Sequence, residues 1–266
     1  EITPDYDLDL MSPKQSLESL TSKILIGISN LLVKIKPDVV FVQGDTTTSF
    51  ASALAAFYKM IPVAHIEAGL RTNNIYSPFP EEINRRMTTS MASFHFPPTK
   101  QSQQNLLNEG VDKDTIKIAG NTVIDALLTV SNKIDKETDK YDNYFSESYN
   151  IHFNHKKTIL VTGHRRESFG DGFENICTAI KHISENNNFQ IIYPVHLNPN
   201  VQEPVNRILG NLSNVHLIPP QDYVHFIFLM KKADIILTDS GGLQEEAPSL
   251  GKPVLVMRDT TERPEG

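Results

Sequence analysis

The chain has 266 residues, of which 39% are hydrophobic and 21% charged, a composition typical of a soluble globular protein and not of a disordered or collagen-like one. Its 25 basic and 32 acidic residues give a formal net charge of −7, which argues against a general nucleic-acid binder, because such proteins neutralise phosphates with cations. The single cysteine, Cys177, excludes an internal disulfide and a multi-thiolate zinc site, and no apolar run approaches the ~18 residues of a membrane span.

Short β-branched runs alternate with amphipathic runs along the chain, which is the pattern of repeated βα units. In the first half we expect strands at 38–43, 62–66, 94–96 and 115–118, and helices at 47–60, from 81 onward and at 100–108. In the second half we expect strands at 158–161, 190–194, 215–218, 234–237 and 253–257, and helices at 173–183, 226–231 and 243–250. The sequence therefore predicts an α/β fold with two doubly wound, Rossmann-like parallel sheets covered on both faces.

A polar and charged stretch from 131 to 157 interrupts this alternation, and we interpret it as a helix tail followed by a surface connection between two domains. The chain can equally cross at Gly120-Asn121, where a predicted strand ends. We place the boundary there, with an N-terminal domain at 1–120 and a C-terminal domain at 121–266. Sheets of this kind bind ligands beyond the carboxyl ends of their strands, so two of them facing one another predict an interdomain cleft lined by the strand-to-helix loops.

Three carboxylates of the first half stand where such loops begin or end. Asp45 follows the first strand, Glu67 follows the second, and Glu81 opens the next helix. Each alone fits a helix cap or a helix dipole, and the set can be a chance group of such acids. Gathered in one cleft, carboxylates raise one another's pKa and become candidate general acids and bases. His65-Ile-Glu67 also matches the first part of a zinc deaminase signature, but one cysteine cannot supply the rest, so we expect no metal site.

The second half supplies cations and glycines at the corresponding places. His164 and Arg165 follow its first strand, and Ser240-Gly241-Gly242 precedes a helix whose N-terminal amides can hold a diphosphate. Glu246 could accept both hydroxyls of a ribose, and Arg263 offers a further cation. The alternatives are a structural histidine, an ordinary Gly-Gly turn and a solvated helical acid. There is no Walker motif and no Gly-x-Gly-x-x-Gly, so neither NTP hydrolysis nor hydride transfer is indicated, and we expect no cofactor.

Seven motifs, taken together and in order, resemble the bacterial non-hydrolysing UDP-N-acetylglucosamine 2-epimerases, a family of the two-domain glycosyltransferase-B fold. The motifs are Gln43-Gly-Asp-Thr-Thr-Thr48, His65-Ile-Glu-Ala-Gly-Leu-Arg71, Pro80-Glu-Glu-Ile-Asn-Arg85, Gly120-Asn-Thr-Val-Ile-Asp125, Gly163-His-Arg-Arg-Glu167, Thr238-Asp-Ser-Gly-Gly-Leu-Gln-Glu-Glu-Ala-Pro248 and Thr260-Thr-Glu-Arg-Pro264. The resemblance implies catalytic roles for Asp45, Glu67, Glu81 and His164, and UDP binding by Ser240, Gly241, Gly242, Glu246 and Arg263. It associates Arg165 and His196 with a second, activating substrate molecule in some members.

The resemblance further implies reversible epimerisation of UDP-N-acetylglucosamine to UDP-N-acetylmannosamine at C2, by elimination and re-addition of UDP. We expect a cytoplasmic homodimer that binds UDP-N-acetylglucosamine and UDP, serves cell-surface polysaccharide synthesis, and needs neither nucleic acid nor membrane. Three alternatives remain open. They are a hydrolysing epimerase that releases N-acetylmannosamine and UDP, a retaining glycosyltransferase with the same UDP site, and a non-catalytic UDP-sugar-binding regulator, against which the intact acid set argues.

The ends of the chain depart from the family pattern. Family members begin with a strand and a Gly-Thr-Arg-Pro-Glu loop, and they continue past Glu-Arg-Pro with a helix that returns to the first domain. Neither segment is present in this sequence. We therefore expect the chain to be truncated at both ends and its N-terminal sheet to need a further strand from upstream of Glu1.

Overall fold

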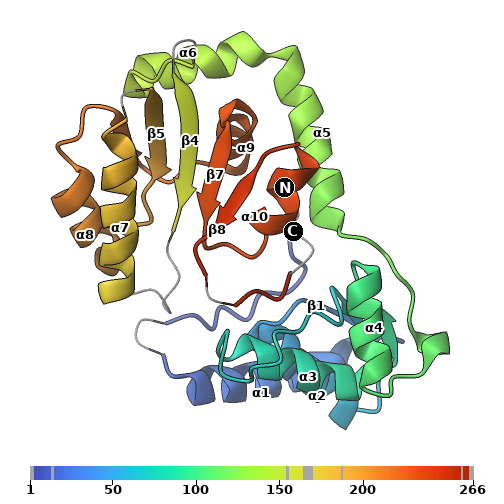
Figure 1. Cartoon of the computed structure of the whole chain (residues 1–266). Helices are drawn as coiled ribbons and strands as arrows, with labels where there is room; N and C mark the ends of the chain where they lie inside the picture. Colours follow the sequence, from blue (N-terminus) through green and yellow to red (C-terminus); the bar gives the residue numbers. More distant parts are fainter. Residues whose placement is uncertain are drawn as a thin grey trace. The chain divides into compact units, whose positions relative to one another are not determined.

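The computed structural model describes residues 3–12, 15–153, 156–163, 170–186, 188–258 and 260–263 (Figure 1). The chain divides into two compact units, unit 1 (Glu1–Asn121) and unit 2 (Thr122–Gly266), and each contains one parallel sheet. Among the described residues, no helix combines the length and the hydropathy that crossing a membrane requires.

Unit 1 contains a three-stranded sheet in the order β1-β2-β3, and both strand pairs are parallel. The strands are β1 (Val40–Gln43), β2 (Val63–Ile66) and β3 (Phe94–Phe96), and the helices are α1 (Leu17–Ile35), α2 (Thr47–Tyr58), α3 (Glu81–Met91) and α4 (Lys100–Asn108). The alanines of α2 let it approach α1 and β1 closely, and together these elements bury a small apolar cluster around Val42, Ala55 and Val63.

Three helices of unit 1 begin at a hydroxyl residue that caps them. Ser16, Thr46 and Thr99 each accept a hydrogen bond from the backbone N–H three residues later, which satisfies one of the unpaired amides of the first turn. The Thr46 cap starts α2 directly behind Asp45, so the local sequence determines where the loop after β1 ends.

Unit 2 contains a five-stranded sheet in the order β6-β5-β4-β7-β8, with every pair parallel. Its strands are β4 (Lys157–Thr162), β5 (Phe189–Pro194), β6 (Val215–Ile218), β7 (Ile235–Thr238) and β8 (Val254–Val256). Its helices are α5 (Thr122–Lys136), α6 (Thr138–Tyr149), α7 (Asp171–Ser184), α8 (Pro199–Leu209), α9 (Tyr223–Lys232) and α10 (Leu243–Ser249). The chain builds outward from β4 to β6 and then returns to the other side of β4, so the switch in strand order lies between β4 and β7.

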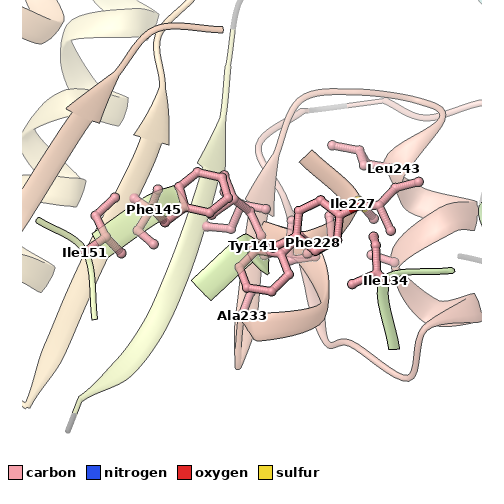
Figure 2. Close-up of a cluster of buried hydrophobic side chains, with 14 of the residues drawn as sticks. Ile134, Tyr141, Phe145, Ile151, Ile227, Phe228, Ala233 and Leu243 are labelled. Atoms are coloured by element: carbon pink, nitrogen blue, oxygen red, sulfur yellow. The ribbon is translucent and has the colours of Figure 1, made fainter. Parts of the chain in front are cut away.

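The core of unit 2 lies on both faces of this sheet. Ile159 and Val161 of β4 pack in one apolar cluster with α7 and α8, whereas Leu160 between them packs in a second cluster with α5, α6 and α9. Figure 2 shows part of the second cluster, where Phe145 stacks on Phe228 with ring centroids 5.5 Å apart. Since alternate residues of a strand point to opposite faces, the sheet is covered by helices on both sides, as the apolar runs of its strands indicate.

The structure differs from the sequence-based expectations in four places. Helices α1 and α8 were not expected. The strand expected at 115–118 is wrong: the 3₁₀ turn Lys113–Thr115 and a single bridge between His95 and Ile116 stand there. Pro97 and Pro98 follow β3 and have no backbone N–H, so the ladder cannot continue along it. The surface connection expected within 131–157 instead contains α6, whose Tyr141 and Phe145 lie four residues apart and are buried.

Candidate functional site

Two of the expected acids meet around Gly44 in unit 1. Gly44 follows β1 with φ +70°, and its N–H donates to the carbonyl of Ile66 at the end of β2, so the two loops leave the sheet together. A Cβ at Gly44 would lie 3.3 Å from Glu67 Oε2. The Glu67 carboxylate therefore lies over Gly44, next to the residue that carries the second acid, Asp45.

His65 supports this arrangement from within the sheet. Its side chain is fully buried, and its Nε2 lies 2.8 Å from the carbonyl oxygen of Gly44. Burial lowers the pKa of His65 to about 4, against the opposing effect of the Gly44 bond, so the ring is neutral at pH 7. Because a carbonyl only accepts, Nε2 carries the proton, and Nδ1 has no hydrogen-bond partner among the described residues. His65 is thus an uncharged support for the Gly44-Asp45 turn.

Asp45 is ion-paired with an arginine that the sequence reasoning did not single out. Its Oδ2 lies 2.7 Å from Nη2 and 2.9 Å from Nε of Arg85, and its backbone carbonyl accepts from the side-chain amide of Asn84 at 2.9 Å. The Arg85 side chain is 2% exposed, whereas that of Asp45 is 27% exposed. The turn after β1 is therefore fastened to α3, and the carboxylate lies at the accessible end of the contact.

Glu82 completes this network from the first turn of α3. It is fully buried, and its Oε2 accepts from Arg85 Nη1 at 2.9 Å and from the backbone N–H of Thr72 at 3.0 Å. Its Oε1 accepts from the N–H of Asn73 at 3.2 Å and from Arg86 Nε at 3.3 Å. A carboxylate that accepts this many hydrogen bonds joins α3 to the loop that follows Glu67. The signal that could have found it is the i, i+3 spacing of Glu82 and Arg85.

Glu81, the third expected acid, opens α3. It lies one helical turn before Arg85, on the same face as that arginine. Its Oε2 is buried and has no hydrogen-bond partner among the residues that the structure describes. The structure thus brings Asp45 and Glu67 together at Gly44 and places Glu81 on the helix that holds Asp45.

The loop after β2 is held tightly where it passes α4. Gly69 has φ +84°, and a Cβ there would lie 2.2 Å from the backbone oxygen of Ser102. Two residues later, Arg71 forms a two-pronged contact with Glu109, with Nε–Oε1 and Nη2–Oε2 both at 2.7 Å. These hydrogen bonds hold the pKa of Glu109 below its usual range. The loop that carries Glu67 is therefore fixed on the C-terminal side of that residue.

The UDP residues expected in unit 2 lie at its topological switch point. The hydroxyls of Thr162 on β4 and Thr238 on β7 are 2.6 Å apart and join the carboxyl ends of the two strands. The Thr238 hydroxyl also accepts from the backbone N–H of Ser240 at 3.0 Å, which sets the course of the Ser240-Gly241-Gly242 turn before α10. The expected residues His164 and Arg165 follow β4, but they lie outside the described residues.

Glu246 lies on α10, and Arg263 lies beside that helix. Glu246 Oε2 lies 3.8 Å from a Cβ built on Gly242, and burial raises the pKa of Glu246, while a hydrogen bond from the Tyr223 hydroxyl opposes that shift. Arg263 Nε donates to Glu245 Oε1 at 2.9 Å, and its Nη1 donates to Glu262 Oε1 at 2.5 Å. The cation expected for UDP is thus held beside α10 by two carboxylates.

His196 lies just past β5, in the Pro194–Asn198 segment. It is exposed, and its Nδ1 accepts from the backbone N–H of Asn198 at 3.1 Å. Across the described ranges, no group of three or more His, Cys, Asp or Glu residues is arranged to hold a metal ion.

Comparisons with known proteins agree with the family resemblance of the seven motifs. A family model described as UDP-N-acetylglucosamine 2-epimerase matches residues 1–266. Two curated relatives, the UDP-N-acetylglucosamine 2-epimerases of Escherichia coli K12 and Salmonella typhimurium, are 60% and 59% identical over 265 residues. Each match covers 99% of this chain and 70% of the relative.

Solved structures match over similar shares of their length. The UDP-GlcNAc 2-epimerase from Neisseria meningitidis bound to UDP-GlcNAc is 51% identical, with a TM-score of 0.94 over 99% of this chain and 71% of that one. The Methanocaldococcus jannaschii UDP-GlcNAc 2-epimerase in complex with UDP-GlcNAc and UDP is 37% identical, with a TM-score of 0.83 over 99% of this chain and 71% of that one. The α/β fold with parallel sheets is thereby confirmed.

Proposed function

Because the chain belongs to the UDP-N-acetylglucosamine 2-epimerase family, we propose that it is an isomerase that interconverts UDP-N-acetylglucosamine and UDP-N-acetylmannosamine at C2. The observation that carries this proposal is the placement of the matched motifs at the carboxyl ends of parallel strands in both units. In unit 1 these ends hold carboxylates, and in unit 2 they hold a glycine turn and a half-buried acid. Carboxylates suit proton transfer, and exposed amides before a helix suit a diphosphate.

Unit 2 binds the UDP portion in this proposal. The backbone N–H groups of Gly241 and Gly242 and the Ser240 hydroxyl hold the diphosphate, and Arg263 adds a positive charge nearby. Glu246 accepts the ribose hydroxyls, and its hydrogen bond with Tyr223 supports that orientation. The relatives crystallised with UDP-GlcNAc or UDP support this class of ligand.

Unit 1 moves the protons. The C2–H bond of the sugar breaks, its electron pair forms the C1=C2 double bond, and the C1–O bond breaks with its electrons leaving on UDP. A carboxylate among Asp45, Glu67 and Glu81 accepts the C2 proton, and cations stabilise the charge that develops on the departing diphosphate. In the second step UDP re-adds at C1 of the glucal while a proton is delivered to the opposite face of C2. The family resemblance implies that His164 belongs to this site. It associates Arg165 and His196 with a second, activating substrate molecule.

A glycosyltransferase-B arrangement, with the two units facing a common cleft that holds the substrate, is part of the proposal. What supports it is that each unit carries its half of the chemistry on the carboxyl edge of its own sheet. A homodimer and a cytoplasmic location likewise stay predictions.

Proton NMR of UDP-N-acetylglucosamine incubated with the full chain in D₂O tests the function. We expect UDP-N-acetylmannosamine with deuterium at C2, since the abstracted proton exchanges with solvent. Free N-acetylmannosamine with UDP would identify a hydrolysing epimerase, and UDP binding without turnover would identify a regulator.

Two variants separate binding from chemistry in the same assay. Glu246→Ala should weaken UDP binding by about 1.5–3 kcal/mol for each charge-assisted hydrogen bond lost. Glu67→Gln should leave UDP affinity nearly unchanged and depress turnover. Equal losses of UDP affinity in both variants would contradict the division of roles.

A further inference from the structure

One oxygen of the Asp45 carboxylate is already committed to a neighbouring side chain. Both contacts from Arg85, through Nε and Nη2, reach Oδ2. Oδ1 has no hydrogen bond to any residue that the structure describes, and the Asp45 side chain keeps 27% of its surface exposed. The carboxylate is therefore held from behind by one oxygen and presents the other outward.

Arg85 can hold Asp45 in this way because it is itself fixed. Its side chain is 2% exposed, and the remaining arm of its guanidinium, Nη1, donates to the fully buried Glu82. A guanidinium is planar, so the directions of its two ends are coupled, and it cannot turn toward a new partner without giving up both carboxylates. The buried cation also has the counter-charge that burial demands.

Glu82 connects this pair to the rest of the site. Its two oxygens accept the backbone N–H groups of Thr72 and Asn73, in the loop that follows Glu67. The same two residues, Glu82 and Arg85, thus contact the loop behind one candidate acid and the side chain of another. A displacement of the guanidinium would be passed to Asp45 directly.

We propose that Arg85 and Glu82 are positioning residues for the epimerisation: Glu82 orients the Arg85 guanidinium, and the guanidinium holds Asp45 by Oδ2 so that Oδ1 faces the reacting sugar. This inference rests on the proposed function and deepens it. Neither residue touches the substrate, so their removal should reduce turnover through Asp45 and leave the UDP portion bound as before.

The first test is Arg85→Lys in the full chain, assayed by NMR for epimerisation and by calorimetry for UDP. Lysine keeps the charge but cannot reach Asp45 and Glu82 in two fixed directions. We expect kcat to fall about 100-fold, the loss typical of a misplaced reacting group, with KM and the Kd for UDP within about twofold of the wild-type values. The matched control is Arg207→Lys in unit 2, which likewise changes an arginine held by two carboxylates, Glu174 and Glu203, but touches none of the candidate acids.

A second variant keeps the test decisive if Arg85→Lys does not fold. Glu82→Gln with Arg85→Ala removes both buried charges together and leaves space for a small cation. Added guanidinium should restore at least about a tenth of the lost kcat in this double variant, and should do nothing for the Asp45→Asn protein.

The outcomes separate this inference from the function beneath it. Wild-type protein that does not epimerise UDP-N-acetylglucosamine overturns both. If the wild type is active, three results overturn the positioning role and leave the proposed function intact. They are full kcat in Arg85→Lys, a loss of kcat no greater than that of Arg207→Lys, and no guanidinium rescue of the double variant.

Discussion

Each unit is stabilised internally by a different kind of interaction. Around its short sheet, unit 1 buries charged and polar side chains that form hydrogen bonds, among them His65, Glu82 and Arg85. The sheet of unit 2 lies between two large apolar clusters, and ion pairs such as Arg207–Glu174 lie on its surface. A buried ion pair of unit 2, Arg258–Glu262, lies outside both clusters.

This difference follows from what each unit has to do. Apolar contacts are non-directional, so they stabilise unit 2 without specifying where a single carboxylate points. Hydrogen-bonded charges are directional, and in unit 1 they determine the orientation of Asp45. Buried charges are costly to separate, however, so unit 1 should tolerate the loss of one partner poorly.

The largest effect should come from Glu82→Leu. The change leaves Arg85 without its buried counter-charge and two loop amides without an acceptor, and we expect a loss of about 3–5 kcal/mol in the free energy of unfolding, measured by urea titration. The same substitution in unit 2, Glu174→Leu, removes a surface partner of Arg207 that is 53% exposed and should cost about 1 kcal/mol or less. Equal losses for the two variants would remove the distinction between the units.

Phe145→Ala tests the apolar side of the comparison. Phe145 of α6 is fully buried beside Tyr144, Phe153 and Phe228, and its loss leaves a cavity on one face of the unit 2 sheet. We expect the free energy of unfolding to fall by about 3–4 kcal/mol, because aromatic neighbours can close part of the space. Hydrogen exchange should rise in α6 and α9 while peptides from β2 and α3 of unit 1 stay protected. A uniform rise in both units would show that they do not depend on separate cores.

The smallest effect is a pH dependence of the stability, to which His65 should contribute more than His216. The pKa of His65 is about 4 in the folded chain against an ordinary value of 6.5, so between these values the unfolded chain binds more protons. Stability should therefore be complete above about pH 6.5 and fall toward pH 4, with a His65 contribution of up to about 3 kcal/mol. Burial also lowers the pKa of His216, which is only half-buried.

Thermal melts at pH 7 and pH 5 check this sign and its location. His65→Gln keeps a side-chain N–H for Gly44 but cannot take up a proton, so it should lose less stability on acidification than the wild type. His216→Gln should relieve the acid sensitivity less. A wild-type protein that is more stable at pH 5 than at pH 7, or a larger relief from His216→Gln, would contradict the assignment.

Much of the fold was predictable because it depends on short-range patterns. Apolar runs such as Ile159–Val161 mark strands whatever lies around them, and the Ser240-Gly241-Gly242 turn needs no distant partner to be recognised. α6 was missed because its buried residues, Tyr141 and Phe145, are dispersed among charged ones, and a face of two aromatic residues is a weak periodic signal.

The candidate site was predictable as a set of residue types but not as a network. Asp45 and Glu67 could be placed at neighbouring strand ends from the βα pattern alone. Their partners could not, because Asp45 and Arg85 are 40 residues apart, and which cation meets which carboxylate depends on helix rotation and side-chain rotamers. Sequence reasoning interpreted the motif that contains Glu82 and Arg85 through helix dipoles, whereas in the structure these residues hold the loops together.

Gly69 limits how this protein can be altered by evolution or by design. With a positive φ and the Ser102 carbonyl where a Cβ would be, every other amino acid at this position clashes with backbone and not with a side chain that can move aside. A saturation library at position 69 should therefore return glycine alone among active clones. Diversity in this loop is better directed to residues 74–76, which are exposed and do not have a positive φ.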